Sequence, residues 1–110
     1  MRFSVVVPLY NKENCIRMTL ESVKKQSFKD YEVIVVDDGS TDRSLEEARK
    51  IKSENITIIH QQNQGVSVAR NTGILHAQGQ YIAFLDADDE WEPDYLKTID
   101  HLIEKYPESD

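Results

Sequence analysis

Two short hydrophobic runs in this chain each lead directly into acidic residues. The run YEVIVV is followed by Asp37 and Asp38, and the run YIAFL is followed by Asp86, Ala87 and Asp88. Short runs rich in β-branched and aromatic residues are typical of buried parallel strands. Both acidic clusters are therefore expected just past the carboxyl end of a strand, the edge at which open α/β sheets bind their ligands.

Strand and helix patterns alternate along the 110 residues, and this order predicts a single small domain. Such alternation implies a parallel sheet with helices on both faces, so the expected fold class is α/β, doubly wound and Rossmann-like, with about four strands. Strand four is expected beside strand one, at the switch point of the sheet. The strands are predicted at residues 3–9, 32–36, 56–60 and 81–85, and the helices at 12–26, from a cap at Ser40 or Thr41 through Ile51, at 66–77, and from Pro93 through Tyr106.

Polar and small residues predict the details of these helices. Asn11 is expected to cap the first helix and Ser40, Thr41 or Asp42 the second, because short polar side chains satisfy the free amides at a helix start. Gly73 costs about 1 kcal/mol in helix propensity relative to alanine, which favours close packing of the third helix on the sheet. The expected inner face of that helix consists of Ala69, Gly73 and Ala77.

The composition, 39% hydrophobic and 30% charged, is that of a soluble globular domain. The net charge of −7 argues against general nucleic-acid binding, and an anionic ligand would need a metal ion or a local arginine to overcome repulsion. The single cysteine, Cys15, cannot form an internal disulfide. No apolar run approaches the roughly 20 residues of a transmembrane segment, and the N-terminus shows no signal-peptide pattern. We therefore expect a cytoplasmic location, in solution or at the inner face of a membrane in a longer protein.

The acidic residues form a candidate metal and nucleotide site. Carboxylates gathered at one sheet edge repel one another unless a cation joins them, and such hard oxygen ligands suit Mg²⁺ or Mn²⁺, which usually arrive with phosphates. Asp86 and Asp88 are the expected metal ligands, because an Asp-x-Asp sequence leaving a strand can turn alternate side chains toward one ion. Asp38 is expected to hold a ribose or a base. Asp89 is expected in a solvated turn.

Two further residues are candidates for ligand contact. Arg70 lies among small and apolar residues, so its guanidinium is expected to pair with Asp38 or Asp88 and to meet a phosphate or a uracil oxygen. A solvated surface arginine is the alternative. Tyr10 follows strand one at the same edge and could stack on a base or pack against the first helix, two readings that the sequence leaves open. Neither Gly-x-Gly-x-x-Gly nor a Walker sequence occurs.

Four segments in order along the chain carry a family resemblance. They are VVVPLYN at 5–11, VVDDGSTD at 35–42, NQG at 63–65 with ARNTG at 69–73, and FLDADD at 84–89. Together they resemble the family 2 glycosyltransferases, which have the GT-A fold. One such segment is a weak signal, whereas four with the family's spacing cover nearly the whole chain.

The resemblance implies transfer of a sugar from a nucleotide-diphosphate donor, a UDP-sugar, to an acceptor hydroxyl. Inversion at the sugar, a divalent cofactor (Mn²⁺ or Mg²⁺) and a role in cell-wall or polysaccharide biosynthesis follow from it as well. The metal would neutralise charge that builds on the leaving diphosphate. By motif position, the implied site comprises Pro8 and Tyr10 at the base pocket, Asp38 at the uracil or ribose, Arg70 at the base, Asp86 at the ribose and metal, and Asp88 at the metal.

The family's acceptor-binding half has no counterpart in residues 1–110. The resemblance therefore implies that this chain is the N-terminal, nucleotide-sugar-binding part of a glycosyltransferase, with its general base beyond residue 110 and no transfer activity of its own. The acceptor could be a saccharide, a lipid or a protein. Without the second half, the outer edge of strand four would be exposed and could mediate homodimer formation.

Two alternatives belong to other functional classes. A phospho-acceptor receiver domain is also a small doubly wound sheet with carboxylates holding magnesium, but it expects an acidic pair after strand one, where this chain has Pro8, Leu9 and Tyr10. A nucleotide-binding module without catalysis is the other alternative. Donor binding without sugar transfer would support it.

Overall fold

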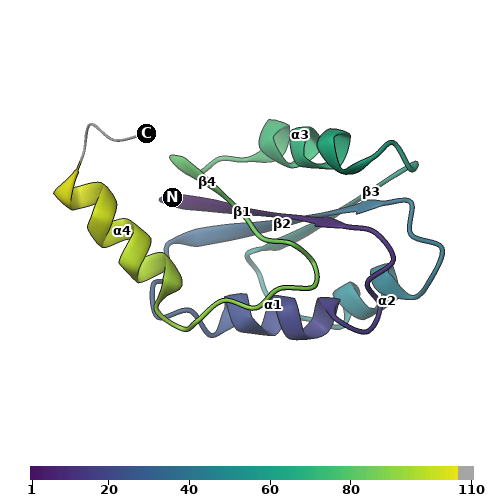
Figure 1. Ribbon diagram of the computed structural model, residues 1–110, viewed down its shortest axis with the longest axis horizontal. Coiled ribbons are helices and arrows are strands. Elements are labelled where there is room, and N and C mark those ends of the chain that lie inside the picture. The colour runs from purple at the N-terminus through teal and green to yellow at the C-terminus, as the bar shows by residue number, and fades with distance from the viewer. Residues whose placement is uncertain (107–110) are drawn as a thin grey trace.

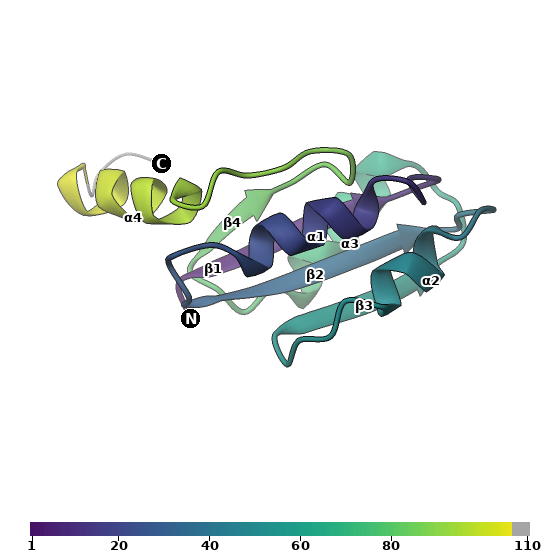
Figure 2. The same ribbon diagram turned by 90° about the horizontal axis from the view of Figure 1, so that it is seen from below.

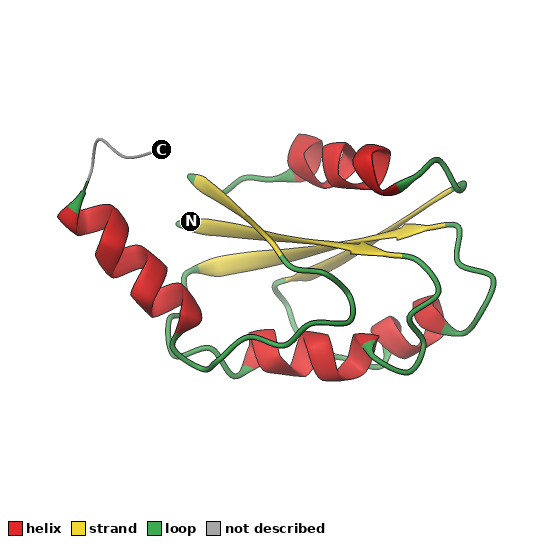
Figure 3. Ribbon diagram, in the orientation of Figure 1, coloured by secondary structure: helices red, strands yellow, loops and turns green. Residues whose placement is uncertain are grey.

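The structure, a computed structural model, describes residues 1–106 and forms three layers. In Figures 1 and 3, α3 covers one face of the sheet, α1 and α2 cover the other, and α4 lies beyond the amino ends of the strands. The elements in chain order are β1 (Phe3–Leu9), α1 (Ile16–Lys24), β2 (Tyr31–Asp38), α2 (Ser44–Arg49), β3 (Ile56–Gln61), α3 (Val66–His76), β4 (Tyr81–Phe84) and α4 (Tyr95–Lys105).

The described sheet has the strand order β3-β2-β1-β4, and all its pairings are parallel. β1 therefore lies between β2 and β4, and the strand order reverses there, which confirms the predicted doubly wound fold and the predicted neighbour of strand one. A receiver domain has the order 2-1-3-4-5. The strand order of this chain is different, so the receiver alternative is wrong.

Both faces of the two central strands are buried, which explains their continuous apolar sequences. Val5 and Val33 pack with Ile16 and Leu20 of α1 on one face. Ile34 and Val36 pack with Ala69 of α3 on the other. Because successive side chains of a strand point to opposite faces, the two aspartates that end β2 also point to opposite faces.

The predicted close approach of α3 to the sheet is confirmed at Gly73. Ala69 and Gly73 are buried and Ala77 is partly buried. A Cβ added at Gly73 would lie 2.4 Å from Cγ1 and 3.1 Å from Cγ2 of Val6, which is fully buried in β1. The absence of a side chain at this position therefore sets the distance between helix and sheet.

We expect Gly73→Ala to lower the free energy of unfolding by about 1–3 kcal/mol, because overpacking a buried contact costs that much. The helix-propensity gain of about 1 kcal/mol is too small to offset the clash with a stiff β-branched residue. Urea unfolding measures the change. In a Val6→Ala background, which removes both clashing methyl groups, Gly73→Ala should cost nothing or stabilise. A stabilised Gly73→Ala in the parent background would contradict the packing argument.

Several predicted helix starts and caps are wrong. α1 begins at Ile16 rather than at residue 12, and α2 begins at Ser44. The N-cap residues Cys15 and Arg43 make no side-chain cap bond, and of the predicted caps only Asp42 accepts an amide at a helix start, that of Ser44. Asn11 has a φ of 50°, in the left-handed region, which differs from the extended backbone of an N-cap residue. These polar residues instead hold two loops together at the site. α4 ends at Lys105, so Tyr106 lies outside it and is exposed.

α4 lies at the amino end of the sheet (Figure 2), where its apolar stripe and one arginine hold it. Leu96 is fully buried. The guanidinium of Arg2 donates to Asp100 at 2.9 Å and to Glu104 at 3.0 Å. β4 forms one edge of the sheet and exposes Tyr81, Ile82 and Phe84 in part. Among the described residues, no helix has the length and apolar character that crossing a membrane requires.

Candidate functional site

The loops that follow β1 and β2 are joined by side-chain hydrogen bonds at the carboxyl edge of the sheet. Each bond links a backbone amide of one loop to a side-chain oxygen of the other, so the polar residues predicted as helix caps bind across the loops. The donor and acceptor pairs are Asn11 N to Ser40 Oγ (3.0 Å), Lys12 N to Ser44 Oγ (2.7 Å), Glu13 N to Asp42 Oδ2 (3.2 Å), Thr41 N to Asn11 Oδ1 (2.8 Å) and Arg43 N to Glu13 Oε2 (2.9 Å). Asp42 also accepts the amide of Ser44 at 2.9 Å, which satisfies one free amide at the start of α2.

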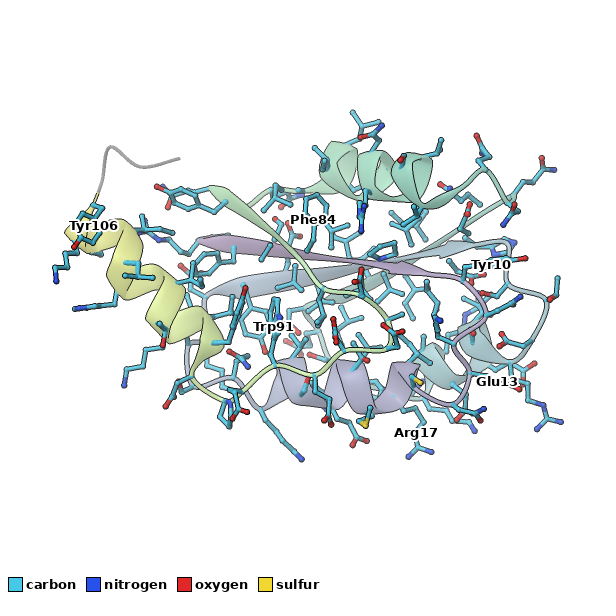
Figure 4. The ribbon with its side chains drawn as sticks, in the orientation of Figure 1. Tyr10, Glu13, Arg17, Phe84, Trp91 and Tyr106 are labelled. Atoms are coloured by element: carbon cyan, nitrogen blue, oxygen red, sulfur yellow. The ribbon has the colours of Figure 1, made fainter. Side chains whose placement is uncertain are left out.

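A pocket of about 440 Å³ opens beside these loops. Figure 4 places Tyr10 at this end of the sheet and Glu13 in the adjoining loop. The pocket brings together five of the six predicted site residues from three separate strand ends. Its lining consists of Pro8, Leu9, Tyr10, Lys12, Asp38, Asn63, Gly65, Val66, Ala69, Asp86, Ala87 and Asp88.

Asp38 lies at one end of the pocket, 3% exposed, and holds the turn that precedes α3. Its Oδ1 accepts the side-chain amide of Gln61 and the backbone amide of Gln64, both at 2.9 Å. Its Oδ2 accepts the backbone amide of Gly65 at 2.9 Å and has a longer contact, 3.4 Å, with Asn63. Gly65, whose amide points at the carboxylate, has a φ of 100°. Glycine adopts such a positive φ without steric cost.

The pKa of Asp38 reflects two opposing causes. Burial is the largest single cause and raises it, but the hydrogen bonds from Gln61, Gln64 and Gly65 together lower the pKa below its ordinary value. Asp38 is therefore an ionised carboxylate whose charge is balanced by amide donors. Sequence reasoning identified this residue but missed its structural role in the turn.

Asp37 points to the opposite face, among the side chains packed under α1 and α2. Its Oδ2 lies 2.8 Å from Nδ1 of His60, its neighbour on β3, and its Oδ1 is buried without a protein partner among the described residues. His60 is in contact with solvent, and β3 extends one residue beyond the predicted strand end, to Gln61. The acidic pair that ends β2 therefore contributes one carboxylate to the pocket.

The acidic segment after β4 forms a turn at the other end of the pocket. The amide of Asp89 donates to the carbonyl of Asp86 at 3.0 Å. Ala87 is buried, whereas Asp86 and Asp88 on either side of it are exposed. One carboxylate oxygen from each of Asp86, Asp88 and Asp89 lies within 4.8 Å of the other two. Asp89 was expected in a solvated turn, and its place in this cluster was not predicted. The run of acidic residues at 86–90 was the signal for it.

Two cations flank this turn, and one of them was not foreseen. Nζ of Lys12 lies 3.6 Å from Oδ2 of Asp88, and the guanidinium of Arg70 lies 3.6 Å from Oδ1 of Asp86. The expected pairing of Arg70 with Asp38 or Asp88 is therefore wrong: its partner is Asp86. Arg70 does not belong to the pocket lining, and its guanidinium lies over the ring of Phe84, 5.7 Å from the centroid (Figure 4 labels Phe84).

The two ends of the pocket have different chemistry. Pro8, Leu9 and Ala69 line it with apolar side chains beside the buried Asp38, and the exposed Asp86, Asp88 and Lys12 also line it. Asp89 is close to Asp86 and Asp88 but is not part of this lining. A pocket with an apolar slot, one buried acceptor and a cluster of hard oxygen ligands suits a ligand that has a flat ring at one end and metal-bound phosphates at the other. Fold and pocket together define the chain as a doubly wound α/β domain with a pocket at the switch point, where such sheets bind their ligands.

The chain belongs to glycosyl transferase family 2, whose family description matches residues 4–109. It is 42% identical over 107 residues to glycosyltransferase GlyA of Streptococcus pneumoniae. That alignment covers 96% of this chain and 15% of GlyA, so the chain spans a small part of this relative.

Solved structures share the fold. The S. aureus protein TarS, as residues 1–349 in complex with UDP-GlcNAc, superposes with a TM-score of 0.90 and 36% identity. This match covers 96% of the present chain and 32% of that chain. The mannosyltransferase PcManGT from Pyrobaculum calidifontis, in complex with GDP-Man and Mn²⁺, gives a TM-score of 0.87 and 29% identity over 93% of the present chain and 32% of its own. These matches confirm the predicted family and its α/β fold.

Proposed function

We propose that this chain binds a nucleotide-diphosphate-sugar, with a UDP-sugar as the preferred donor, and that the protein to which it belongs transfers the sugar to an acceptor hydroxyl with inversion. The observation that carries the proposal is one pocket that joins the buried Asp38 to the acidic turn at residues 86–89. The complexes of TarS with UDP-GlcNAc and of PcManGT with GDP-Man and Mn²⁺ support a donor of this chemical class. The chain is the donor-binding part of the domain in this proposal.

The base is proposed to lie at the Asp38 end. Pro8 and Tyr10 border the slot, and the exposed ring of Tyr10 can stack on a flat base. A carboxylate has about four acceptor positions, and three well-formed amide bonds occupy most of those of Asp38. The remaining position, on Oδ2, has only the long 3.4 Å contact with Asn63, and an N–H from a uracil or a hydroxyl from a ribose would replace that contact. Uracil carries such an N–H at N3, whereas cytosine has an acceptor there.

The diphosphate is proposed to lie at the acidic turn. Asp86 and Asp88, with Asp89 beside them, would hold a divalent ion, and their hard oxygen donors fit Mg²⁺ or Mn²⁺. A bound ion would supply Lewis-acid stabilisation of the charge on the leaving diphosphate. Lys12 and Arg70 offset the charge of this carboxylate cluster, and both can reach toward an anionic ligand at the same rim. We assign Arg70 to this rim, beside Asp86, rather than to the base.

Calorimetry with a panel of nucleotides tests the proposal. UDP is expected to bind with Mn²⁺ present and to lose most of its affinity when EDTA is added. CDP and ADP should bind more weakly than UDP under the same conditions, because they do not offer a matching N–H to Asp38. Equal affinities for the three nucleotides would contradict the placement of the base at Asp38. UDP binding that does not depend on the metal would contradict the placement of a metal ion at the acidic turn.

The outer edge of β4 is proposed as a surface for self-association. Unpaired backbone groups and the part-exposed side chains of Tyr81, Ile82 and Phe84 form a template for strand pairing in the isolated chain. Light scattering should show a dimer that dissociates in an Ile82→Lys variant. A parent chain that stays monomeric at high concentration would contradict this proposal. A cytoplasmic location and a role in polysaccharide biosynthesis also remain proposals.

A further inference from the structure

The helix α1 carries a row of polar side chains that is buried against the segment leaving β4. Thr19, Ser22 and Gln26 follow one another at spacings of three and four, which places them along one side of the helix and its C-terminal extension. Thr19 and Gln26 are fully buried, an unusual position for polar side chains unless they have partners. The hydrogen-bond partners of these three side chains show which segment this side of α1 holds in place.

The whole row binds the backbone of residues 87–96. The hydroxyl of Thr19 donates to the carbonyl of Ala87 at 2.9 Å, and the hydroxyl of Ser22 accepts the amide of Trp91 at 3.2 Å. Gln26 donates to the carbonyl of Glu92 at 2.6 Å and accepts the amide of Leu96 at 2.9 Å. Figure 1 shows this segment passing alongside α1, and Figure 4 shows Trp91 where the two meet. The segment thus follows a path fixed by α1.

Thr19 acts at the acidic turn itself. Ala87 separates Asp86 from Asp88, and its carbonyl belongs to the peptide that leads into Asp88. Within the turn, one backbone hydrogen bond, from Asp89 to Asp86, closes the loop. The bond from Thr19 fixes the orientation of the central peptide, and Ala87 is buried so that its two acidic neighbours point outward.

We propose that Thr19 is a positioning residue for the metal-binding turn. It holds the carbonyl of Ala87 beneath the sheet edge and thereby holds the carboxylates of Asp86 and Asp88 in one orientation before the metal arrives. Thr19 does not line the pocket, so its effect passes through the backbone of Ala87. This inference rests on the proposed metal site and assigns a metal-dependent role to a residue on the far side of the turn.

The test measures Mn²⁺ affinity by electron paramagnetic resonance of free Mn²⁺, in the presence of UDP and without any transfer assay. Thr19→Val keeps the shape of the side chain and removes the donor. We expect its Mn²⁺ affinity to fall by about tenfold or more, the usual effect of losing a partner that orients a ligand. Thr19→Ser keeps the hydroxyl and should restore the parent affinity.

Ser27→Ala is the matched control. The hydroxyl of Ser27 donates to the carboxylate of Asp94 at the far end of the same segment, so its loss should leave Mn²⁺ affinity unchanged. If Thr19→Val does not fold, the Thr19→Cys variant replaces it, because its S–H is a weaker donor and its affinity should lie below that of Thr19→Ser. The role of Thr19 would be overturned if Thr19→Val bound Mn²⁺ with the parent affinity. It would also be overturned if Thr19→Ser did not restore that affinity. A parent chain that binds no Mn²⁺ would overturn the metal site and this role together.

Discussion

Asp88→Asn is expected to abolish the Mn²⁺-dependent part of UDP binding while leaving the fold intact. Asp88 is exposed and packs against nothing in the core, so replacing its carboxylate should leave the free energy of unfolding of the domain unchanged. Loss of an orienting partner alone costs 10–100-fold in metal affinity, and loss of a ligand should cost at least on the order of 100-fold. Calorimetry with UDP, with and without Mn²⁺, measures the change, and thermal unfolding verifies the fold.

Glu90→Gln provides the matched control for this substitution. Glu90 is an exposed carboxylate in the same segment and lies outside the acidic trio of Asp86, Asp88 and Asp89. Glu90→Gln removes the same unit of negative charge as Asp88→Asn, so a purely electrostatic effect on UDP affinity would appear in both variants. If Asp88→Asn binds UDP with parent affinity in the presence of Mn²⁺, Asp88 is not a metal ligand.

Asp38→Asn is expected to lower both stability and uridine binding. The new NH2 group would take the place of one carboxylate oxygen, so a donor would face the backbone amide of either Gln64 or Gly65, and the remaining amide would lose a charged acceptor. Hydrogen bonds to a charged acceptor are worth about 1.5–3 kcal/mol each. We expect a loss of about 2–3 kcal/mol in the free energy of unfolding. UDP should also weaken more than ADP, because the base loses its acceptor.

The ratio of UDP to ADP affinity separates the two roles of Asp38. A residue that only braced the turn would weaken both nucleotides by the same factor when substituted. A residue that also reads the base changes the ratio. Calorimetry on the parent, Asp38→Asn and Asp38→Ala gives this ratio, and equal losses for both nucleotides in both variants would remove Asp38 from the base site.

The stability difference between parent and Asp38→Asn is expected to depend on pH. The folded-state pKa of Asp38 is lowered, so its contribution is fully present above the unfolded value of about 3.9 and is lost as pH falls through the folded pKa. Urea unfolding should therefore show the difference at pH 6 and a smaller one near pH 2.5. A difference that stays constant over this range would mean that ionised Asp38 does not hold the turn.

The strands and the position of the site could be predicted from the sequence because both follow from local patterns. β-branched runs give strands wherever they can be buried on both faces, and acidic residues after such runs must lie at the carboxyl edge of a parallel sheet. The doubly wound topology followed from the alternation of elements. The spacing of Asp86 and Asp88 around Ala87 was also a local feature. The structure buries Ala87 and exposes both aspartates, and their role as metal ligands stays a prediction.

The loop contacts could not be predicted because their partners are distant in sequence. Asn11 and Ser40 have the short polar side chains that are typical of helix caps. They lie 29 residues apart in the sequence, and nothing in the local sequence favours a bond between their two loops over a bond to the adjoining helix. Arg70 likewise has three acidic candidates at one sheet edge. Only the tertiary position of α3, which places Arg70 over the ring of Phe84 in β4, decides that Asp86 is its partner.

By itself, the sequence determined which strands form, that they run parallel, and at which edge of the sheet the carboxylates gather. Only the tertiary structure decided which carboxylate of the pair that ends β2 faces the pocket. In a strand with one exposed face, alternation of polar and apolar residues would reveal its orientation, but β2 is buried on both faces and reads as continuously apolar. The pairing of β2 between β1 and β3, with α3 above it, turns Asp38 into the pocket and Asp37 toward His60.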